Sequence, residues 1–349
     1  MKIIYIIYCA LITLAAFSAP ASADIVGDAN NDGRITTTDS VLALQMSVGS
    51  VAPDLESADV NGDGRVSSLD ALMMLTMAQK TQVCVNAPET VSDTFNATVD
   101  IYNVADLDSG QFDLSFDSSV VNVTGVDSGS IDGTTVPVSG WRFIDADTIR
   151  VLVDLSGADT VTGSGSLATV NFEITRSVGD KSVLDISDGG LFDLDTYSDG
   201  IPAIWFDNEI TIGASVMVNA PESVSNAFDA KIDIENVTNL DSGQFDLSFN
   251  SSVVNVTDVY DGNIDGTTVP ISDWQFMDVD TIRVLFDLSG ADTVSGSGSL
   301  ATINFEITGS VGDKSVLDIS DGGLFDLDTY GTGIPATWTD CKVTVTGTV

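Results

Sequence analysis

The sequence predicts a mainly β protein, in which two antiparallel β-sandwiches follow a small α-helical module. Three observations support this fold class. Residues 85–212 recur as residues 218–345 with most positions identical. Apolar and polar residues alternate within each copy. Two twelve-residue loops rich in Asp, Asn and Gly stand ahead of the first copy, and each loop is followed by an apolar helix.

The first 23 residues are predicted to be a secretion signal. Lys2 supplies a positive charge, residues 3–17 form an apolar run that is short for a bilayer span, and Ala21-Ser22-Ala23 offers small residues for cleavage. The mature chain would therefore begin at Asp24. We expect the protein to be secreted and extracellular, with any attachment to a cell surface made through a partner.

The bulk composition excludes several classes of function. The chain of 349 residues carries 12 Lys and Arg against 52 Asp and Glu, so its formal net charge is −40. A surface this acidic repels nucleic acids and anionic membranes. The chain contains no His, which excludes His-based catalytic triads and His-ligated zinc. Cys84 and Cys341 permit one disulfide in an exported protein, and their pairing stays open.

Residues 24–80 contain two predicted calcium loops, at 28–39 and 59–70. Each loop offers side-chain oxygens at positions 1, 3 and 5, a Gly at 6, a main-chain carbonyl at 7, a hydroxyl at 9 and a carboxylate at 12. Because Ca²⁺ takes six or more oxygens, this spacing predicts two bound Ca²⁺ ions. The predicted ligands are Asp28, Asn30, Asp32, Arg34, Thr36 and Asp39 in the first loop, and Asp59, Asn61, Asp63, Arg65, Ser67 and Asp70 in the second.

This module is a duplicated loop–helix and not an ordinary EF-hand. Too few residues lie between the predicted cleavage site and Asp28 for an entering helix, and position 12 is Asp in both loops instead of the usual Glu. The module resembles the dockerin family over about residues 25–80. The resemblance implies a small helical fold that binds two Ca²⁺ ions and docks onto a cohesin. It also implies that loop positions 10 and 11 help to choose the partner, which here are Thr37, Thr38, Ser68 and Leu69.

The repeated unit is predicted to be a whole domain, because it is far longer than a solenoid repeat of about 20–50 residues. Lys181–Tyr197, for example, recurs unchanged as Lys314–Tyr330. We place the two domains at residues 84–212 and 217–345, with short linkers at 80–83 and 213–216. Period-two alternation, as at Phe112, Leu114 and Phe116, indicates about nine short strands per copy, which favours an antiparallel sandwich.

Each copy is similar to a cohesin module. The runs that carry the similarity in the first copy are residues 111–117, 120–123, 149–154 and 165–172. The resemblance implies a nine-stranded jelly-roll sandwich that receives a dockerin on one sheet face. Outward residues of two strands are the predicted docking residues in each copy, namely Gln111, Asp113, Leu152 and Asp154, and then Gln244, Asp246, Leu285 and Asp287.

Together these features predict a secreted non-catalytic adaptor. Its dockerin would bind a cohesin-bearing protein, and its two cohesins would recruit dockerin-bearing clients, for polysaccharide degradation by resemblance to the family. One alternative is a carbohydrate-binding β-sandwich protein, and another is a calcium-stabilised surface or adhesion protein. The tryptophans test the carbohydrate-binding alternative, because side chains packed in a core would not be free to stack on sugars. They are Trp141, Trp205, Trp274 and Trp338.

Overall fold

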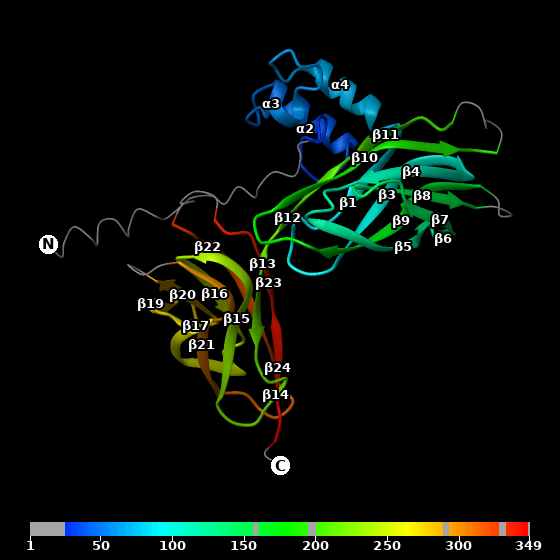
Figure 1. Ribbon diagram of the computed structural model, residues 1–349. Helices are drawn as coiled ribbons and strands as arrows, with labels where there is room; N and C mark the ends of the chain where they lie inside the picture. Colours follow the sequence, from blue (N-terminus) through cyan, green and yellow to red (C-terminus); the bar gives the residue numbers. More distant parts are fainter. Residues whose placement is uncertain (1–24, 156–159, 195–199, 289–292, 328–332, 348–349) are drawn as a thin grey trace. The chain divides into compact units, whose positions relative to one another are not determined.

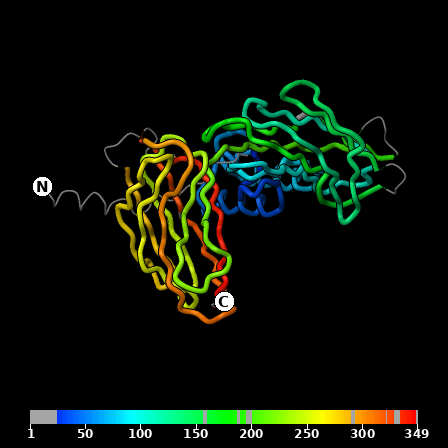
Figure 2. Tube along the Cα trace, turned by 60° about the horizontal axis from the view of Figure 1, so that its bottom comes forward, coloured from blue at the N-terminus to red at the C-terminus, as the bar shows by residue number. Residues whose placement is uncertain are grey.

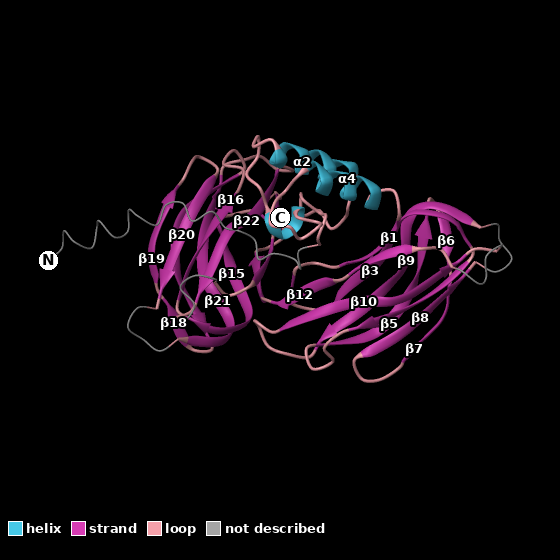
Figure 3. Ribbon diagram, turned by 90° about the horizontal axis from the view of Figure 1, so that it is seen from above, coloured by secondary structure: helices cyan, strands magenta, loops and turns pink. Residues whose placement is uncertain are grey.

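The computed structural model describes residues 25–155, 160–194, 200–288, 293–327 and 333–347. The predicted secretion signal lies outside these residues. The chain divides into two compact units, residues 1–80 and residues 81–349 (Figure 1). In the described residues the helices belong to the first unit and the strands to the second (Figure 3). The described residues contain no helix that is long and apolar enough to cross a membrane.

The first unit is built from helices α2 (Thr37–Ser47), α3 (Leu55–Ala58) and α4 (Ser68–Met77). Thr36 and Ser67 cap α2 and α4, and each forms a capping box with the Asp three residues later. The two capped helices pack together through small and flexible apolar side chains, and the Ser40 hydroxyl donates to the Ala71 carbonyl at 2.7 Å. The same residues that end each loop therefore start each helix.

The first sandwich, residues 81–212, has two six-stranded sheets. One sheet has the order β11-β1-β3-β9-β5-β6 and the other β2-β12-β10-β4-β8-β7. The β1–β11 and β2–β12 pairs are parallel, and the other neighbours are antiparallel. The strands are β1 (Thr81–Asn86), β2 (Thr90–Val91), β3 (Phe95–Leu107), β4 (Ser109–Ser115), β5 (Val121–Ile131), β6 (Thr134–Val136), β7 (Val138–Phe143), β8 (Thr148–Asp154), β9 (Val161–Ile174), β10 (Lys181–Phe192), β11 (Ala203–Phe206) and β12 (Asn208–Ile212).

The second sandwich, residues 214–345, repeats this topology. Its sheets have the orders β18-β17-β21-β15-β13-β23 and β14-β24-β22-β16-β20-β19 (Figure 2, from yellow-green to red). The strands are β13 (Ala214–Asn219), β14 (Ser223–Val224), β15 (Phe228–Leu240), β16 (Ser242–Ser248), β17 (Val254–Ile264), β18 (Thr267–Val269), β19 (Ile271–Phe276), β20 (Thr281–Asp287), β21 (Val294–Ile307), β22 (Lys314–Phe325), β23 (Ala336–Thr339) and β24 (Cys341–Val345).

Each sandwich encloses its own apolar core. Along β4 the inward residues Phe112 and Leu114 are 1% and 0% exposed, as the alternation of the sequence predicts. Phe95 stacks on Phe172 with ring centroids 5.0 Å apart. The four tryptophans are half-buried and pack against the two cores. This packing favours a role in the cores over sugar stacking for these side chains.

Almost no chain separates the two sandwiches. The predicted linker ran from residue 213 to 216, but β12 ends at Ile212 and β13 begins at Ala214. The Gly213 amide donates to the Val91 carbonyl at 2.8 Å, and the Ala214 amide donates to the Pro335 carbonyl at 2.8 Å. The backbone thus passes from hydrogen bonds in one sandwich directly to hydrogen bonds in the next.

Both cysteines of the second unit are free thiols in the structure. Cys84 is buried on β1 of the first sandwich, and Cys341 is half-buried on β24 of the second. The disulfide that the sequence left open is not formed in this structure.

Candidate functional site

The first loop folds around the carboxylates at its two ends. Asp28 accepts hydrogen bonds from the amides of Asp32 at 3.1 Å and Gly33 at 2.6 Å. Asp39 accepts from the amides of Asn30 at 3.2 Å and Thr36 at 2.7 Å. These bonds wind the loop into a tight turn in which residues up to nine positions apart meet.

The second loop has the same hydrogen bonds at the same positions. Asp59 accepts from the amides of Asp63 at 3.1 Å and Gly64 at 2.6 Å. Asp70 accepts from the amides of Asn61 at 3.2 Å and Ser67 at 2.8 Å. The sequence repeat is therefore also a repeat of loop geometry.

Three of the four end carboxylates are buried without a basic partner, and the fourth, Asp59, is half-buried. Asp28 is 2% exposed, and Asp39 and Asp70 are 0% exposed. In the described part of the chain no Lys or Arg forms an ion pair with these three, and the ion pair of this unit joins Arg34 to Asp32 at 3.9 Å. Buried charges are normally paired or coordinate a metal. The loops therefore suit a bound cation.

Burial raises the pKa of Asp28, and its amide hydrogen bonds from Gly33 and Asp32 only partly oppose this shift. Burial also raises the pKa of Asp70, but hydrogen bonds, first from the Ser67 hydroxyl and amide, lower it overall. Within the described residues no three Asp, Glu, Cys or His side chains gather as a metal site by themselves. A Ca²⁺ shell in either loop would thus need the Asn amide oxygens and the main-chain carbonyls as well.

The predicted recognition residues of the helical module all lie at its surface. Thr37 and Thr38 are exposed at the start of α2, and Ser68 and Leu69 are exposed at the start of α4. The sequence reading missed that other apolar helix residues are exposed beside them. These are Val41 at 53%, Leu44 at 44% and Leu72 at 57%. Val41 and Leu72 follow positions 10 and 11 of their loops by four and three residues, and Leu44 follows Val41 by three, which was the available signal.

The predicted docking residues of the first sandwich lie on neighbouring strands. Gln111 pairs with Leu152, and Asp113 pairs with Arg150, across β4 and β8. Leu152 is 39% exposed, so this row of side chains points away from the core. We call this surface of the β2-β12-β10-β4-β8-β7 sheet, and its counterpart in the second sandwich, the outward face. Asp154 follows at the end of β8.

The carboxylate of Asp113 is already bound within its own sheet. Arg150 donates through Nε and Nη2 to the two carboxylate oxygens, both at 2.6 Å. Asp246 and Arg283 form the same bidentate pair at 2.7 Å in the second sandwich. Both arginines were missed as members of the face. The alternation along residues 149–154 places Arg150 on the same side as Leu152 and was the signal for them.

The second sandwich repeats the arrangement. Gln244 pairs with Leu285 and Asp246 pairs with Arg283, while Asp287 ends β20. One end of the outward face is a shallow hollow in both copies. Its matching walls are Ser115, Phe116, Asp117, Asp147, Val183 and Asp185 in the first copy, and Ser248, Phe249, Asn250, Asp280, Val316 and Asp318 in the second.

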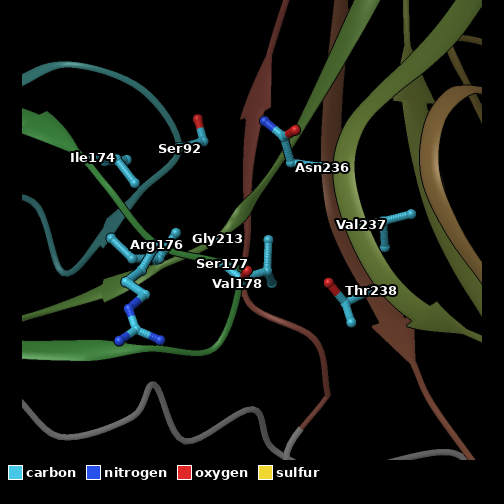
Figure 4. A pocket seen from close by; sticks show the side chains of 10 residues that line it. Ser92, Ile174, Arg176, Ser177, Val178, Gly213, Asn236, Val237 and Thr238 are labelled. Atoms are coloured by element: carbon cyan, nitrogen blue, oxygen red, sulfur yellow. The ribbon is translucent and has the colours of Figure 1, made fainter. Parts of the chain in front are cut away.

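A further pocket lies in the second unit where the two sandwiches meet (Figure 4). Ser92 and Arg176 line it from one sandwich, and Asn236, Val237 and Thr238 line it from the other. The Arg176 guanidinium donates to the Ser119 carbonyl at 2.9 Å. Apolar side chains of Ile174, Val178 and Ile212 also line this pocket, which has no counterpart within either copy.

Comparison with known families agrees with this geometry. A cohesin domain model matches residues 83–212 and 216–345. A dockerin type I domain model matches residues 26–77. Among curated proteins, Cellulose-binding protein A of Clostridium cellulovorans is 21% identical over 244 residues, which cover 67% of this chain and 13% of that protein. The chain thus spans only a small part of this relative.

Three solved structures also resemble parts of the chain. A non-cellulosomal cohesin from Archaeoglobus fulgidus is 21% identical, with a TM-score of 0.32, and covers 38% of this chain and 91% of that one. A type II cohesin dyad from the adaptor ScaA scaffoldin of Acetivibrio cellulolyticus is 13% identical, with a TM-score of 0.30, and covers 76% and 98%. A type I cohesin–dockerin complex from Clostridium thermocellum is 20% identical, with a TM-score of 0.32, and covers 38% and 94%.

Proposed function

The chain belongs to the cohesin family and carries a type I dockerin domain ahead of its two cohesin domains, and we propose from this that it is a secreted, non-catalytic scaffold. Its dockerin binds a cohesin on another protein in a calcium-dependent manner. Its two cohesins each recruit a client, by which we mean a dockerin-bearing protein. The complexes that it builds act in polysaccharide degradation.

One observation carries this proposal above the others. Both sandwiches present the same residues on the outward face in the same register, with a Gln beside an exposed or half-exposed Leu and an Asp held by an Arg. A protein surface with an apolar anchor inside a polar rim is typical of a binding site. No enzyme chemistry is needed to explain this repetition.

The helical module supports the other half of the proposal. If Ca²⁺ binds, the oxygens at loop positions 1, 3, 5, 7, 9 and 12 would hold it. The ion would then neutralise the carboxylates at the loop ends. An ion bound in each loop would fix the starts of α2 and α4, where the exposed recognition residues lie. Docking through these helices therefore depends on the loops.

The test is affinity capture, with the full-length protein as the bait and the culture supernatant of the producing organism as the source of clients. We expect dockerin-bearing proteins to be retained in Ca²⁺ and released by a chelator. Leu152→Asp combined with Leu285→Asp should abolish their retention, because a charge replaces the apolar anchor on both faces. Retention of the same clients by this double variant would disprove the assignment of the face. If no dockerin-bearing protein is retained by the unmodified chain, the scaffold function itself is wrong.

A further inference from the structure

The outward faces of the two sandwiches are the same at their centre and different at their edges. Strands β4 and β16 have identical sequences, and β8 differs from β20 only where Val153 is replaced by Phe286. Both of those side chains are buried in the cores. Any difference in what the two faces recognise must therefore come from the flanking strands.

The first edge is formed by β7 in one copy and β19 in the other. Gly140 lies opposite Leu152 and Arg142 opposite Arg150, which places both on the outward face. Arg142 is exposed and forms no ion pair with a described residue. The counterparts are an exposed Asp273 opposite Leu285 and an exposed Gln275 opposite Arg283. This edge is therefore positive in the first sandwich and negative in the second.

The opposite edge changes in the other direction. On β12, Glu209 lies opposite the exposed Val183 and pairs with Lys181 at 2.5 Å, so the edge is neutral. On β24 its counterpart is Lys342, which is exposed and lies opposite Val316. Lys314 and Lys342 form no ion pair with described residues, and Lys314 turns to the hollow of the face. This edge is therefore positive in the second sandwich.

One more charge differs between the two edges. Asp117 lines the hollow of the first sandwich, and the uncharged Asn250 replaces it in the second. Each side chain accepts a hydrogen bond from the hydroxyl two residues later, at 2.6 Å, so the turn itself is unchanged. The replacement removes a negative charge from the second face without altering its shape.

We propose that the two cohesins select different clients by charge, a proposal that rests on the scaffold function above. The first sandwich favours a dockerin that presents an acidic side chain to the β7 edge. The second favours a dockerin that presents an acidic side chain to the β24 edge and a basic one to the β19 edge. The shared centre of Gln, Leu and the Asp–Arg pair supplies the affinity common to both. The edge residues therefore determine specificity, because unlike charges attract and like charges exclude the wrong partner.

The test uses the full-length chain with one face disabled at a time. Leu285→Asp leaves the first sandwich as the reporter, and Leu152→Asp leaves the second. The probe is the calcium-dependent, dockerin-bearing fraction of the culture supernatant, identified by mass spectrometry. We expect the two reporters to enrich different clients, the second set carrying an additional basic residue on the docking helices.

The deciding variant exchanges the edges. Asp117→Asn, Gly140→Asp, Arg142→Gln and Glu209→Lys together give the first sandwich the edge charges of the second. An exposed charge pair at about 4 Å is worth about a factor of five in affinity. We therefore expect a client of the first set to lose at least about fivefold, and a client of the second set to gain as much. Thermal unfolding of each variant verifies that it is folded.

Thr98→Lys is the matched control. It gives β3, in the sheet that does not carry the outward face, the lysine found at the equivalent position 231, and it should change neither affinity. Two reporters that bind the same clients equally, or an edge exchange that moves no affinity, would overturn the proposal while leaving the scaffold function intact. If neither reporter retains a dockerin-bearing protein, the scaffold function fails first and the selection of clients fails with it.

Discussion

At the scale of single residues, the structure contains two kinds of shielded carboxylate that differ in their partners. Asp113 and Asp246 are bound by an arginine of the neighbouring strand. Asp28, Asp39 and Asp70 are more deeply buried and have only hydrogen-bond donors from described residues. The first kind is complete within the protein chain. The second kind would be stabilised by a cation bound in the loops.

The Asp–Arg pairs should contribute to stability as units. Arg150→Gln leaves a carboxylate that is 15% exposed without its bidentate partner, so we expect the first sandwich to lose about 1–3 kcal/mol. Arg283→Gln should cost more, because the Asp246 side chain is only 9% exposed. Adding Asp113→Asn to Arg150→Gln should restore part of the loss. Chemical denaturation of the full chain measures all of these together with Asp113→Asn alone, and a double-variant loss equal to the sum of the two single losses would show that the pair is not coupled.

Asp207 should destabilise the first sandwich at neutral pH and do so less in mild acid. Burial raises the pKa of Asp207 in the folded chain, which disfavours its charged form. Its ionisation thus opposes folding above this pKa, and the penalty disappears as the pH falls through it. Asp207→Asn keeps an oxygen that can accept from the Ile186 amide, so the variant should melt at a higher temperature at neutral pH.

Asp117→Asn is the matched control with the opposite sign. Hydrogen bonds from Ser119 lower the pKa of Asp117, so its ionised form stabilises the fold above the unfolded pKa. That contribution is lost as the pH falls through the lowered pKa. The two variants should therefore differ in the direction of their pH dependence, as measured by melting temperature from pH 3 to 7. Parallel profiles would contradict both assignments.

At the scale of elements, the paired loops and helices of the first unit form one cooperative part. The carboxylates that end the loops also close the capping boxes of α2 and α4. Few apolar residues hold the helices together, since the buried ones on α2 and α4 are Ala43, Met46, Ala71 and Met74. So small a core is marginal without a metal.

Chelation of calcium should therefore unfold this unit alone. We expect hydrogen exchange to accelerate throughout residues 25–80 and to remain unchanged in the strands. Asp28→Ala with Asp59→Ala should reproduce the effect in the presence of Ca²⁺, since each removes the carboxylate that winds its loop. Asp54→Ala, which removes only the cap of α3, is the control. Unchanged protection after chelation would contradict the calcium-dependent fold.

The strands show how far sequence patterns reach. Alternation located β4 and β8 well, because each has one buried and one outward row. It gave no account of β3, whose pairing with β9 shifts register three times. Asn103 and Asp106 adopt positive φ there, at 56° and 54°. Such bends depend on contacts between distant strands, and short polar side chains that tolerate them carry no unique signal.

The candidate site was predictable to a similar degree. The twelve-residue spacing predicts the loop ligands, because local chain geometry alone dictates that pattern. The outward face was only partly predictable. Leu152 and Gln111 follow from alternation, but the edges at Arg142 and Glu209 depend on which strands become neighbours, and strand order is a property of the whole sheet.

At the scale of the whole molecule, the chain combines a binding module with surfaces that could receive such a module, so self-assembly has to be considered. The exposed recognition residues of α2 and α4 are hydroxyl or apolar and carry no charge, as at Thr38, Leu69 and Leu72. The outward faces have charged edges, and the chain as a whole has a net charge of −40. Docking between copies would bring these edges against uncharged helices and two acidic molecules together.

We therefore expect the protein to remain a monomer in calcium. Light scattering over a range of concentrations, at low and moderate salt, measures this directly. Growth of the particle mass with concentration would contradict the prediction, and its loss on Leu69→Asp would then assign the contact to the dockerin. Val279→Asp, at an exposed position between β19 and β20 of the second sandwich, serves as a control for non-specific association.

The near-identity of the two sandwiches has a consequence for folding. Strands β10 and β22 have the same sequence, and so do their partners β4 and β16. A fully unfolded chain therefore contains two equivalent partners for each of these strands, and hydrogen bonding alone does not discriminate between them. Strand exchange between adjacent similar domains is a known route to misassembly. Synthesis from the N-terminus removes the ambiguity, because β10 leaves the ribosome before β16 exists and finds only β4. The order of translation thus supplies information that the sequence of these strands does not contain.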